Sequence, residues 1–319
     1  MASDPGDLPR PTAARSSPDP PPSRDRLWRI GFTAVVAGAL CIAFAPILVR
    51  LSHIPPTATA FQRMLLALPL YLGWILAERS AGRRRGKPVP GRLSPVQTVG
   101  LILAGVFFAF DMAAWHFSVW FTSVTNATLM ANMAPIFVTL VAWMFFRERI
   151  TRQFIVGLVL ALVGAALLMR ASLGIGQRHF IGDALGLLTA CFYAGYLLTV
   201  KNLRASLSTA RLMGGSTLVT CVVLLVIAAA LGEQLFPEDL RGWLVVLALA
   251  WTSQVLGQGL IAFGMAHLPA SFSSVTLLVQ PAAVAMLGWI ILNESLSWWQ
   301  GAGGLAVLVG ILLAGRASR

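Results

Sequence analysis

The sequence predicts an all-α integral membrane protein with ten transmembrane helices in two inverted five-helix repeats. Three observations lead to this fold class. Of the 319 residues, 57% are hydrophobic and 11% are charged, whereas a soluble domain is typically about 45–50% apolar and about 25% charged. Apolar stretches of about 20 residues, the length that crosses a bilayer, recur along the chain. The chain also matches itself at a fixed shift. An ordinary soluble enzyme is therefore excluded.

The apolar stretches give the individual elements. Residues 1–26 hold seven of the 18 prolines and little that could be buried, so we expect a disordered cytoplasmic tail. No cleavage signal precedes the first span, which is expected to stay in the membrane. Ser94 with Gln97, and Ser297 with Gln300, form the capping-box pattern before spans three and ten. The ten predicted spans are residues 28–49, 57–77, 95–117, 121–145, 153–171, 180–200, 210–232, 242–265, 270–291 and 298–315.

The basic residues predict the orientation of these spans. With the N-terminus inside, 19 of the 24 Lys and Arg residues fall on the cytoplasmic side, which is the side where such residues accumulate. Both termini are then cytoplasmic, and the acidic loop 233–239 is outside. The net charge of +12 is interpreted as a contact with anionic headgroups, and we expect no nucleic-acid partner.

The internal repeat is the most informative feature of the chain. A shift of 146 residues pairs Pro135 with Pro281 and Trp143 with Trp289 without a gap. Each half holds five spans, so the second copy enters the membrane in the opposite orientation. Such inverted repeats are typical of secondary transporters, which bind substrate near the bilayer midplane. Chance similarity between apolar helices is the alternative. The same shift pairs Phe117–Phe263, Glu148–Glu294, Gly157–Gly303, Leu162–Leu308, Val163–Val309, Gly164–Gly310 and Leu167–Leu313.

A recurring pattern carries a family resemblance. An apolar span with a central proline is followed by a glutamate and then by a Thr or Ser that opens the next helix. The first copy comprises Pro135, Glu148 and Thr151, and the second comprises Pro281, Glu294 and Ser297. This pattern resembles the paired EamA domains of the drug/metabolite transporter superfamily. The resemblance implies repeats at residues 27–171 and 180–315 and a carrier of the bacterial inner membrane, usually an exporter of amino acids or other small metabolites.

Two charged residues lie within predicted spans. A charge there costs about 2.5–3.5 kcal/mol and by default faces a cavity or a partner. Arg63 and Asp111 each lie about six residues, or roughly 9 Å, below the outer end of a span, and we expect them to approach each other directly or through substrate. They form either a buried ion pair or a site in which Arg63 holds a carboxylate and Asp111 an amine or a proton.

Other polar residues extend this candidate site. Trp115 shares a helix face with Asp111 and is either a membrane-interface anchor or a cavity wall. His116 could titrate near neutral pH or simply be hydrated. The amides could bind substrate or only a neighbouring helix, and the tyrosines offer a stacking surface with a polar tip. These further candidates are Asn132, Tyr193, Tyr196, Gln254, Gln258 and Gln280.

The repeated prolines and glutamates receive separate interpretations. Pro135 and Pro281 interrupt the helical hydrogen bonds and are candidate hinges of a two-state carrier, although membrane helices tolerate proline generally. Glu148 and Glu294 lie at membrane faces. They are interpreted as structural groups that link one helix end to the cap of the next helix, and not as proton carriers.

The sequence thus predicts a secondary transporter for small neutral or zwitterionic metabolites that works by alternating access. Carriers of drugs or of anionic nucleotide-type metabolites, a non-transporting subunit and an intramembrane enzyme are the alternatives. No ATP-binding, HExxH or GxSxG motif occurs, and Cys41, Cys191 and Cys221 lack metal-site spacing. We therefore expect no enzyme activity, cofactor or metal. The open questions are proton antiport versus facilitated flow, and monomer versus homodimer, because the small residues 301–304 permit close packing within or between chains.

Overall fold

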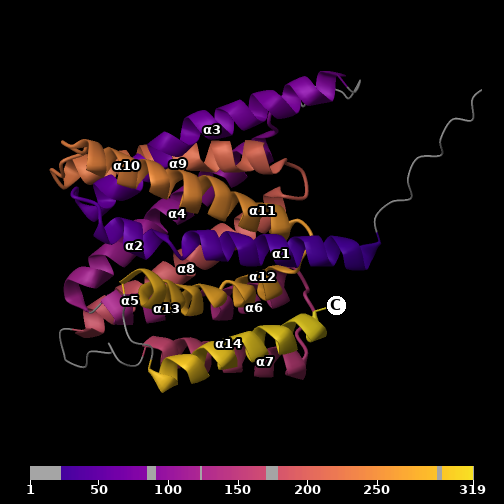
Figure 1. Ribbon diagram of the computed structural model, residues 1–319. Helices are drawn as coiled ribbons and strands as arrows, with labels where there is room; N and C mark the ends of the chain where they lie inside the picture. Colours follow the sequence, from indigo (N-terminus) through magenta and orange to yellow (C-terminus); the bar gives the residue numbers. More distant parts are fainter. Residues whose placement is uncertain (1–22, 85–90, 123, 170–178, 293–296, 319) are drawn as a thin grey trace, which may run out of the picture.

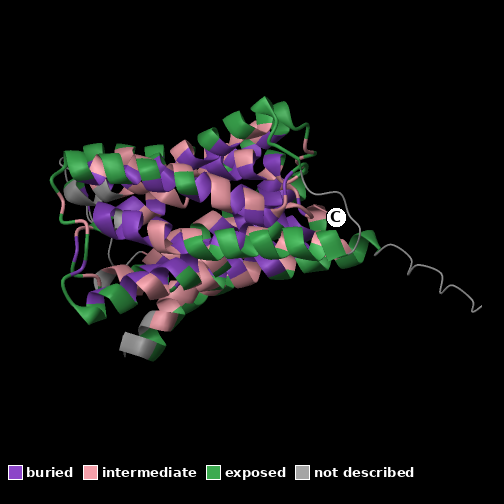
Figure 2. Ribbon diagram, turned by 90° about the horizontal axis from the view of Figure 1, so that it is seen from above, coloured by how far each residue is buried: buried purple, intermediate pink, exposed green. Residues whose placement is uncertain are grey.

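The predicted fold class is confirmed. The computed structural model describes residues 23–84, 91–122, 124–169, 179–292 and 297–318, and every regular element in these ranges is a helix. Ten helical segments of the described chain are long and apolar enough to cross a membrane. They lie side by side as a bundle (Figure 1). Exposed residues cover the outside of the bundle and buried residues fill its interior (Figure 2).

The helices follow the predicted spans closely. The first five spans are α1 (Arg24–Ile42) with α2 (Ala45–Arg50), α3 (Pro56–Arg84), α4 (Pro95–Phe121), α5 (Val124–Ala131) with α6 (Ala134–Phe145), and α7 (Arg152–Met169). The other five are α8 (His179–Leu203), α9 (Thr209–Ala230), α10 (Leu240–Leu249) continuing into the π-helix η2 (Ala250–Gln258) and α11 (Gly259–Met265), α12 (Ala270–Thr276) with α13 (Val279–Leu292), and α14 (Trp298–Ala317).

Both predicted capping boxes are confirmed. Ser94 Oγ accepts a hydrogen bond from the backbone N–H of Gln97, whose side chain in turn accepts one from the N–H of Ser94. Ser297 and Gln300 make the same reciprocal pair before α14. Each box satisfies two N–H groups that have no partner within the helix. These helix starts are therefore fixed by local sequence alone.

The two termini of the bundle lie at the same end. α1 begins and α14 ends at one side (Figure 1), which we call the terminal face, and the opposite end is the distal face. The ends of α3, α6 and α8 also lie at the terminal face. The basic side chains are concentrated there, as the sequence predicted. They are Arg24, Arg26, Arg29, Arg79, Arg83, Arg84, Arg92, Arg147, Arg149, Arg152, Lys201, Arg204, Arg211 and Arg316.

The contact between α7 and α14 shows the two-fold relation of the halves. A Cβ on Gly157 would lie 2.7 Å from the carbonyl oxygen of Gly310, and one on Gly164 would lie 2.6 Å from that of Gly303. The repeat relates Gly157 to Gly303 and Gly164 to Gly310, so the same contact occurs twice with exchanged partners. This is the pattern that a two-fold axis produces. Gly303 therefore packs within the chain.

The two spans that carry the repeated prolines are interrupted at equivalent positions. The fourth span breaks after Ala131, and Pro135 lies in the first turn of α6. The ninth span breaks after Thr276, and Pro281 lies in the first turn of α13. Proline lacks the N–H donor, which an interior helix position needs and a first turn does not. Each of these spans is therefore divided into two helices just before its proline. A hinge motion at these positions stays a prediction.

Candidate functional site

The two intramembrane charges lie at different distances from the ends of their helices. Arg63 is seven residues from the start of α3, and Asp111 is ten residues from the end of α4. These positions correspond to about 10 Å and about 15 Å from the distal ends of the two helices. Asp111 is farther from its helix end than the sequence suggested, because α4 continues to Phe121, and the depth of both charges in the bilayer stays a prediction.

Arg63 and Asp111 interact through space but do not touch. Each charge acts electrostatically on the other, yet among the described residues no direct ion pair joins them. The Arg63 side chain is only 8% exposed, and its Nε has no hydrogen-bond partner. A buried donor without a partner is costly unless something else satisfies it. The direct ion pair, one of the two predicted arrangements, is therefore absent.

Three tyrosines lie within electrostatic range of the guanidinium. All three tyrosines of the chain, Tyr71, Tyr193 and Tyr196, interact electrostatically with Arg63. Tyr196 stacks on Phe108 with ring centroids 4.6 Å apart, and Tyr193 stacks on Tyr196 at 5.9 Å. The aromatic surface from α4 and α8 and the cation from α3 thus enclose one buried region. We call Arg63, Asp111 and the three tyrosines the central cluster.

The two glutamines of span eight join this cluster from a π-helix. The Tyr71 hydroxyl donates to the backbone carbonyl of Gln254 at 2.7 Å, and the Tyr196 hydroxyl is 3.4 Å from Oε1 of Gln258. The Gln254 amide nitrogen donates to Thr217 Oγ1 at 3.1 Å, while its buried Oε1 has no partner. π-Helices are rare and are frequently found at functional sites. Span eight therefore adds two amides and an unsatisfied acceptor to the central cluster.

Sequence reasoning missed Tyr71 and Thr217. The available signal for Tyr71 was the scarcity of tyrosine, since the chain has only three and all of them lie within spans. Nothing in the sequence marked Thr217, because a threonine within an apolar helix usually bonds its own backbone. The nine-residue π-helix also had no local signal.

Several predicted residues lie apart from the cluster. Asn132 lies at the break of span four, where its amide donates to the sulfur of Met169 at 3.9 Å. Gln280 lies half-buried in α13, and no hydrogen bond of the described residues links its side chain to the cluster. Trp115 lies half-buried one turn beyond Asp111. The side chain of His116 lies outside the described part of the structure.

Glu148 contacts the other repeat. Its carboxylate accepts hydrogen bonds from the backbone N–H of Ala270 at 2.7 Å and of Ser271 at 3.2 Å, and from the Ser271 hydroxyl. Glu148 therefore caps α12 and not α7, the next helix, whose cap is Thr151. The predicted partner was wrong because a carboxylate on an extended loop can reach a helix of another repeat. Glu294 lies outside the described residues.

Two further carboxylates make reciprocal contacts between the repeats. At the terminal face, Glu78 at the end of α3 accepts a hydrogen bond of 2.7 Å from the hydroxyl of Ser208, which caps α9. At the distal face, Glu233 after α9 accepts one of 2.7 Å from the N–H of Ala58 at the start of α3. Glu78, Glu148 and Glu233 thus join helix ends of one repeat to helix starts of the other.

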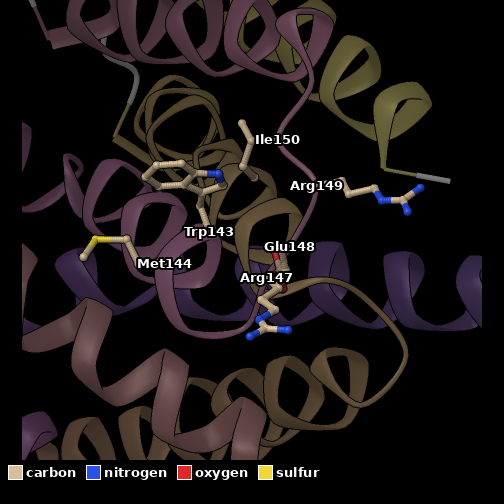
Figure 3. A pocket seen from close by; sticks show the side chains of 6 residues that line it. All are labelled: Trp143, Met144, Arg147, Glu148, Arg149 and Ile150. Atoms are coloured by element: carbon tan, nitrogen blue, oxygen red, sulfur yellow. The ribbon is translucent and has the colours of Figure 1, made fainter.

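A separate open pocket of about 770 Å³ lies at the terminal face. Its lining comes from the end of α6 and the loop that follows (Figure 3), so it does not include the central cluster. A second pocket, of about 270 Å³, lies between the start of α1 and the connection from α11 to α12. The lining residues of the larger pocket are Trp143, Met144, Arg147, Glu148, Arg149 and Ile150.

Comparison with known proteins identifies the class. The EamA-like transporter family matches residues 29–170 and 180–316, so the chain belongs to this family of membrane transporters. It is 25% identical over 219 residues to the pseudopaline exporter CntI of Pseudomonas aeruginosa, covering 69% of this chain and 75% of that protein. It is 23% identical over 291 residues to an uncharacterized transporter of Archaeoglobus fulgidus, covering 91% and 98%. A crystal structure with 18% identity superposes on 93% of this chain and 100% of its own with a TM-score of 0.75, which shows the shared fold.

Proposed function

We propose that this protein is a secondary transporter of the bacterial inner membrane that exports small neutral or zwitterionic metabolites, such as amino acids, by alternating access. One observation carries the proposal. Among the described residues, the buried Nε of Arg63 has no hydrogen-bond partner, and Arg63 interacts electrostatically with Asp111 without a direct ion pair. A ligand with one carboxylate and one ammonium group would pair with both residues, the carboxylate with Arg63 and the ammonium group with Asp111.

The chemistry of the central cluster supports this ligand class. A guanidinium binds a carboxylate through two parallel hydrogen bonds, so Arg63 would hold the acid group and Asp111 the amine. The carboxamides of Gln254 and Gln258 would position the ligand, and the aromatic wall would contact its side chain. One cation and one anion leave the cluster neutral. The site would therefore have no excess positive charge with which to bind an anionic nucleotide. The aromatic wall also suits a flat apolar drug, which is the second candidate.

The repeat architecture supports alternating access. The breaks at Pro135 and Pro281 lie at equivalent positions of the two halves and would serve as hinges. The three inter-repeat carboxylates lie at the faces, where a rocking motion must break contacts on one side at a time. No cofactor, metal or enzymatic step enters this mechanism, and protons remain a candidate coupling ion through Asp111.

The orientation follows from charge. The terminal face carries most of the arginines, so the rule that such residues are cytoplasmic supports cytoplasmic termini. The name of the CntI relative supports export as the direction. The chain would work as a monomer or as a homodimer.

Counterflow in proteoliposomes tests the proposal. Wild type, Asp111→Asn and Arg63→Lys are loaded with a mixed amino-acid pool, and uptake of each labelled amino acid is measured from pH 5.5 to 8. Wild type should exchange a subset of amino acids, and Asp111→Asn should lose that exchange or its pH dependence. Arg63→Lys keeps the charge but loses the two-pronged geometry, so its half-saturating substrate concentration should rise by about tenfold or more.

A matched control removes an arginine outside the cluster. Arg241 is exposed at the distal face, so Arg241→Gln should transport like wild type. Each variant is first shown to be folded by its thermal transition in detergent. Unchanged exchange by folded Asp111→Asn and Arg63→Lys would refute the site. Exchange of drugs instead of amino acids by wild type would favour the second candidate.

A further inference from the structure

Arg147 has an unusual backbone conformation for its residue type. It follows the last turn of α6 with φ at 53°, and no other non-glycine residue in the described chain has a positive φ. The same place after α9 is taken by Gly232, with φ at 66°. Glycine adopts this left-handed conformation freely, whereas a residue with a Cβ pays a conformational cost.

The two helix ends are closed in a similar way, although the returning N–H spans six residues after α6 and five after α9. In each, the left-handed residue is followed by a glutamate whose N–H returns to the end of the helix, with Glu148 bonding the carbonyl of Ala142 and Glu233 that of Ala228. Each glutamate then caps a helix of the other repeat. Glycine would therefore serve the backbone after α6 as it does after α9. The arginine at this strained position indicates that its side chain has a use of its own.

Arg147 lies in a pocket that contains a second arginine and apolar side chains. Arg147 and Arg149 are both exposed and line the 770 Å³ pocket together with the exposed apolar side chains of Trp143 and Met144. The carboxylate of Glu148 is engaged by the start of α12. The pocket therefore combines two arginines with an apolar wall, and its single anion is already bound.

The position and shape of the pocket narrow the ligand class. It directly follows the span Ala127–Phe145, and an apolar wall beside basic groups suits the junction of headgroup and acyl chain. Figure 3 shows Arg147 and Arg149 projecting from the loop in different directions, with Trp143 beside Ile150. Cations so placed fit a headgroup that covers the loop better than one small anion held between them.

We propose that this pocket binds the headgroup of an anionic phospholipid, with Arg147 contacting the phosphodiester, Arg149 attracting the lipid surface from the other side of the loop, and Trp143 and Met144 contacting the upper acyl chains. The bound lipid holds the loop that carries Glu148 and so stabilises the contact with α12. This site is distinct from the central cluster and does not depend on the identity of the transported substrate.

The test is the thermal transition of the full-length protein in neutral detergent, titrated with phosphatidylglycerol or with phosphatidylcholine. Wild type should be stabilised by phosphatidylglycerol and not by phosphatidylcholine. Arg147→Gly removes the cation and relieves the backbone, so without lipid its transition should match or exceed that of wild type. Its half-saturating phosphatidylglycerol concentration should rise about fivefold, the value of one cation near an anionic surface.

Control variants separate this site from general surface charge. Arg152 is exposed at the same face, outside the pocket, so Arg152→Gln should respond to phosphatidylglycerol like wild type. Arg147→Asn provides a second neutral variant, because asparagine tolerates the left-handed conformation. The proposal is overturned if Arg147→Gly and Arg147→Asn keep the wild-type response, if Arg152→Gln loses it equally, or if inorganic phosphate alone reproduces the stabilisation.

Discussion

The contact of Glu148 with α12 allows a quantitative prediction about the conformational equilibrium. Glu148→Ala removes an acceptor for three donors, two of them backbone N–H groups at the start of α12. α12 begins at Ala270 after Pro269 and has no side-chain cap of its own. Ala270 and Ser271 are buried, so in the variant these N–H groups would stay unsatisfied as long as the two repeats are packed as in the structure.

The expected shift of the conformational equilibrium can be estimated from these contacts. A hydrogen bond to a charged group contributes about 1.5–3 kcal/mol, and losing a helix cap costs about 1 kcal/mol. We take about 3 kcal/mol for the whole contact, because the three bonds share one carboxylate and are not additive. A tenfold change in an equilibrium corresponds to about 1.4 kcal/mol. Opening at the terminal face should thus become about 100-fold more favourable in Glu148→Ala. Glu148→Gln, which keeps one acceptor oxygen, should show about a tenfold change.

Spin-label distances measure this shift. Labels on Arg152→Cys and Ala205→Cys, both exposed at the terminal face on different repeats, report its opening after the three native cysteines are replaced by alanine. Glu148→Ala should increase the population at long distance. Glu233→Ala, which removes the distal contact, should leave it unchanged or decrease it. If Glu148→Ala lowers the thermal transition while the distance distribution stays that of its parent, the carboxylate only stabilises α12 locally and the reasoning is refuted.

Two other predictions concern packing and pH. Gly164→Leu places a Cβ 2.6 Å from a backbone oxygen of α14, whereas a Cβ at Gly304 has nothing within 4 Å. Gly164→Leu should therefore lower stability by about 1–3 kcal/mol or more and shift the thermal transition, while Gly304→Leu should not. The pKa of His267 is lowered from 6.5 by burial and by the nearby cations Arg204 and Lys201, so below about pH 6.5 the unfolded chain binds more protons than the folded one. Stability should then fall as the pH drops from 6.5 through the folded pKa; His267→Gln should flatten this dependence between pH 5 and 7, and an unaltered slope would contradict the assignment.

Local physical requirements explain the part of this fold that could be predicted. A bilayer demands about 20 apolar residues for each spanning helix, so hydropathy located the ten spans. Ser94 and Ser297 set helix starts through contacts three residues away. The repeated prolines marked the two breaks because proline lacks a backbone donor, although Pro69 lies inside the uninterrupted α3. The repeat could also be found from the sequence, because both copies lie in one chain at a constant spacing of 146 residues.

The central cluster was predictable only in part. Arg63, Asp111 and the glutamines were found because polar groups in a span are costly and therefore need a reason. Their mutual arrangement was not found, because it depends on which faces of α3, α4 and α8 meet. The ion pair illustrates this, since two charges expected to approach each other form no direct ion pair among the described residues.

Sequence alone thus determined which segments cross the membrane, how the halves are related and which polar groups the membrane must accommodate. The tertiary structure decided that Glu148 caps α12 instead of α7 and that Tyr71 holds a carbonyl of a π-helix. The physical reason is the range of the interactions. Hydropathy and capping act within one helix, whereas these contacts join residues more than 100 positions apart and exist only once the two repeats have packed together.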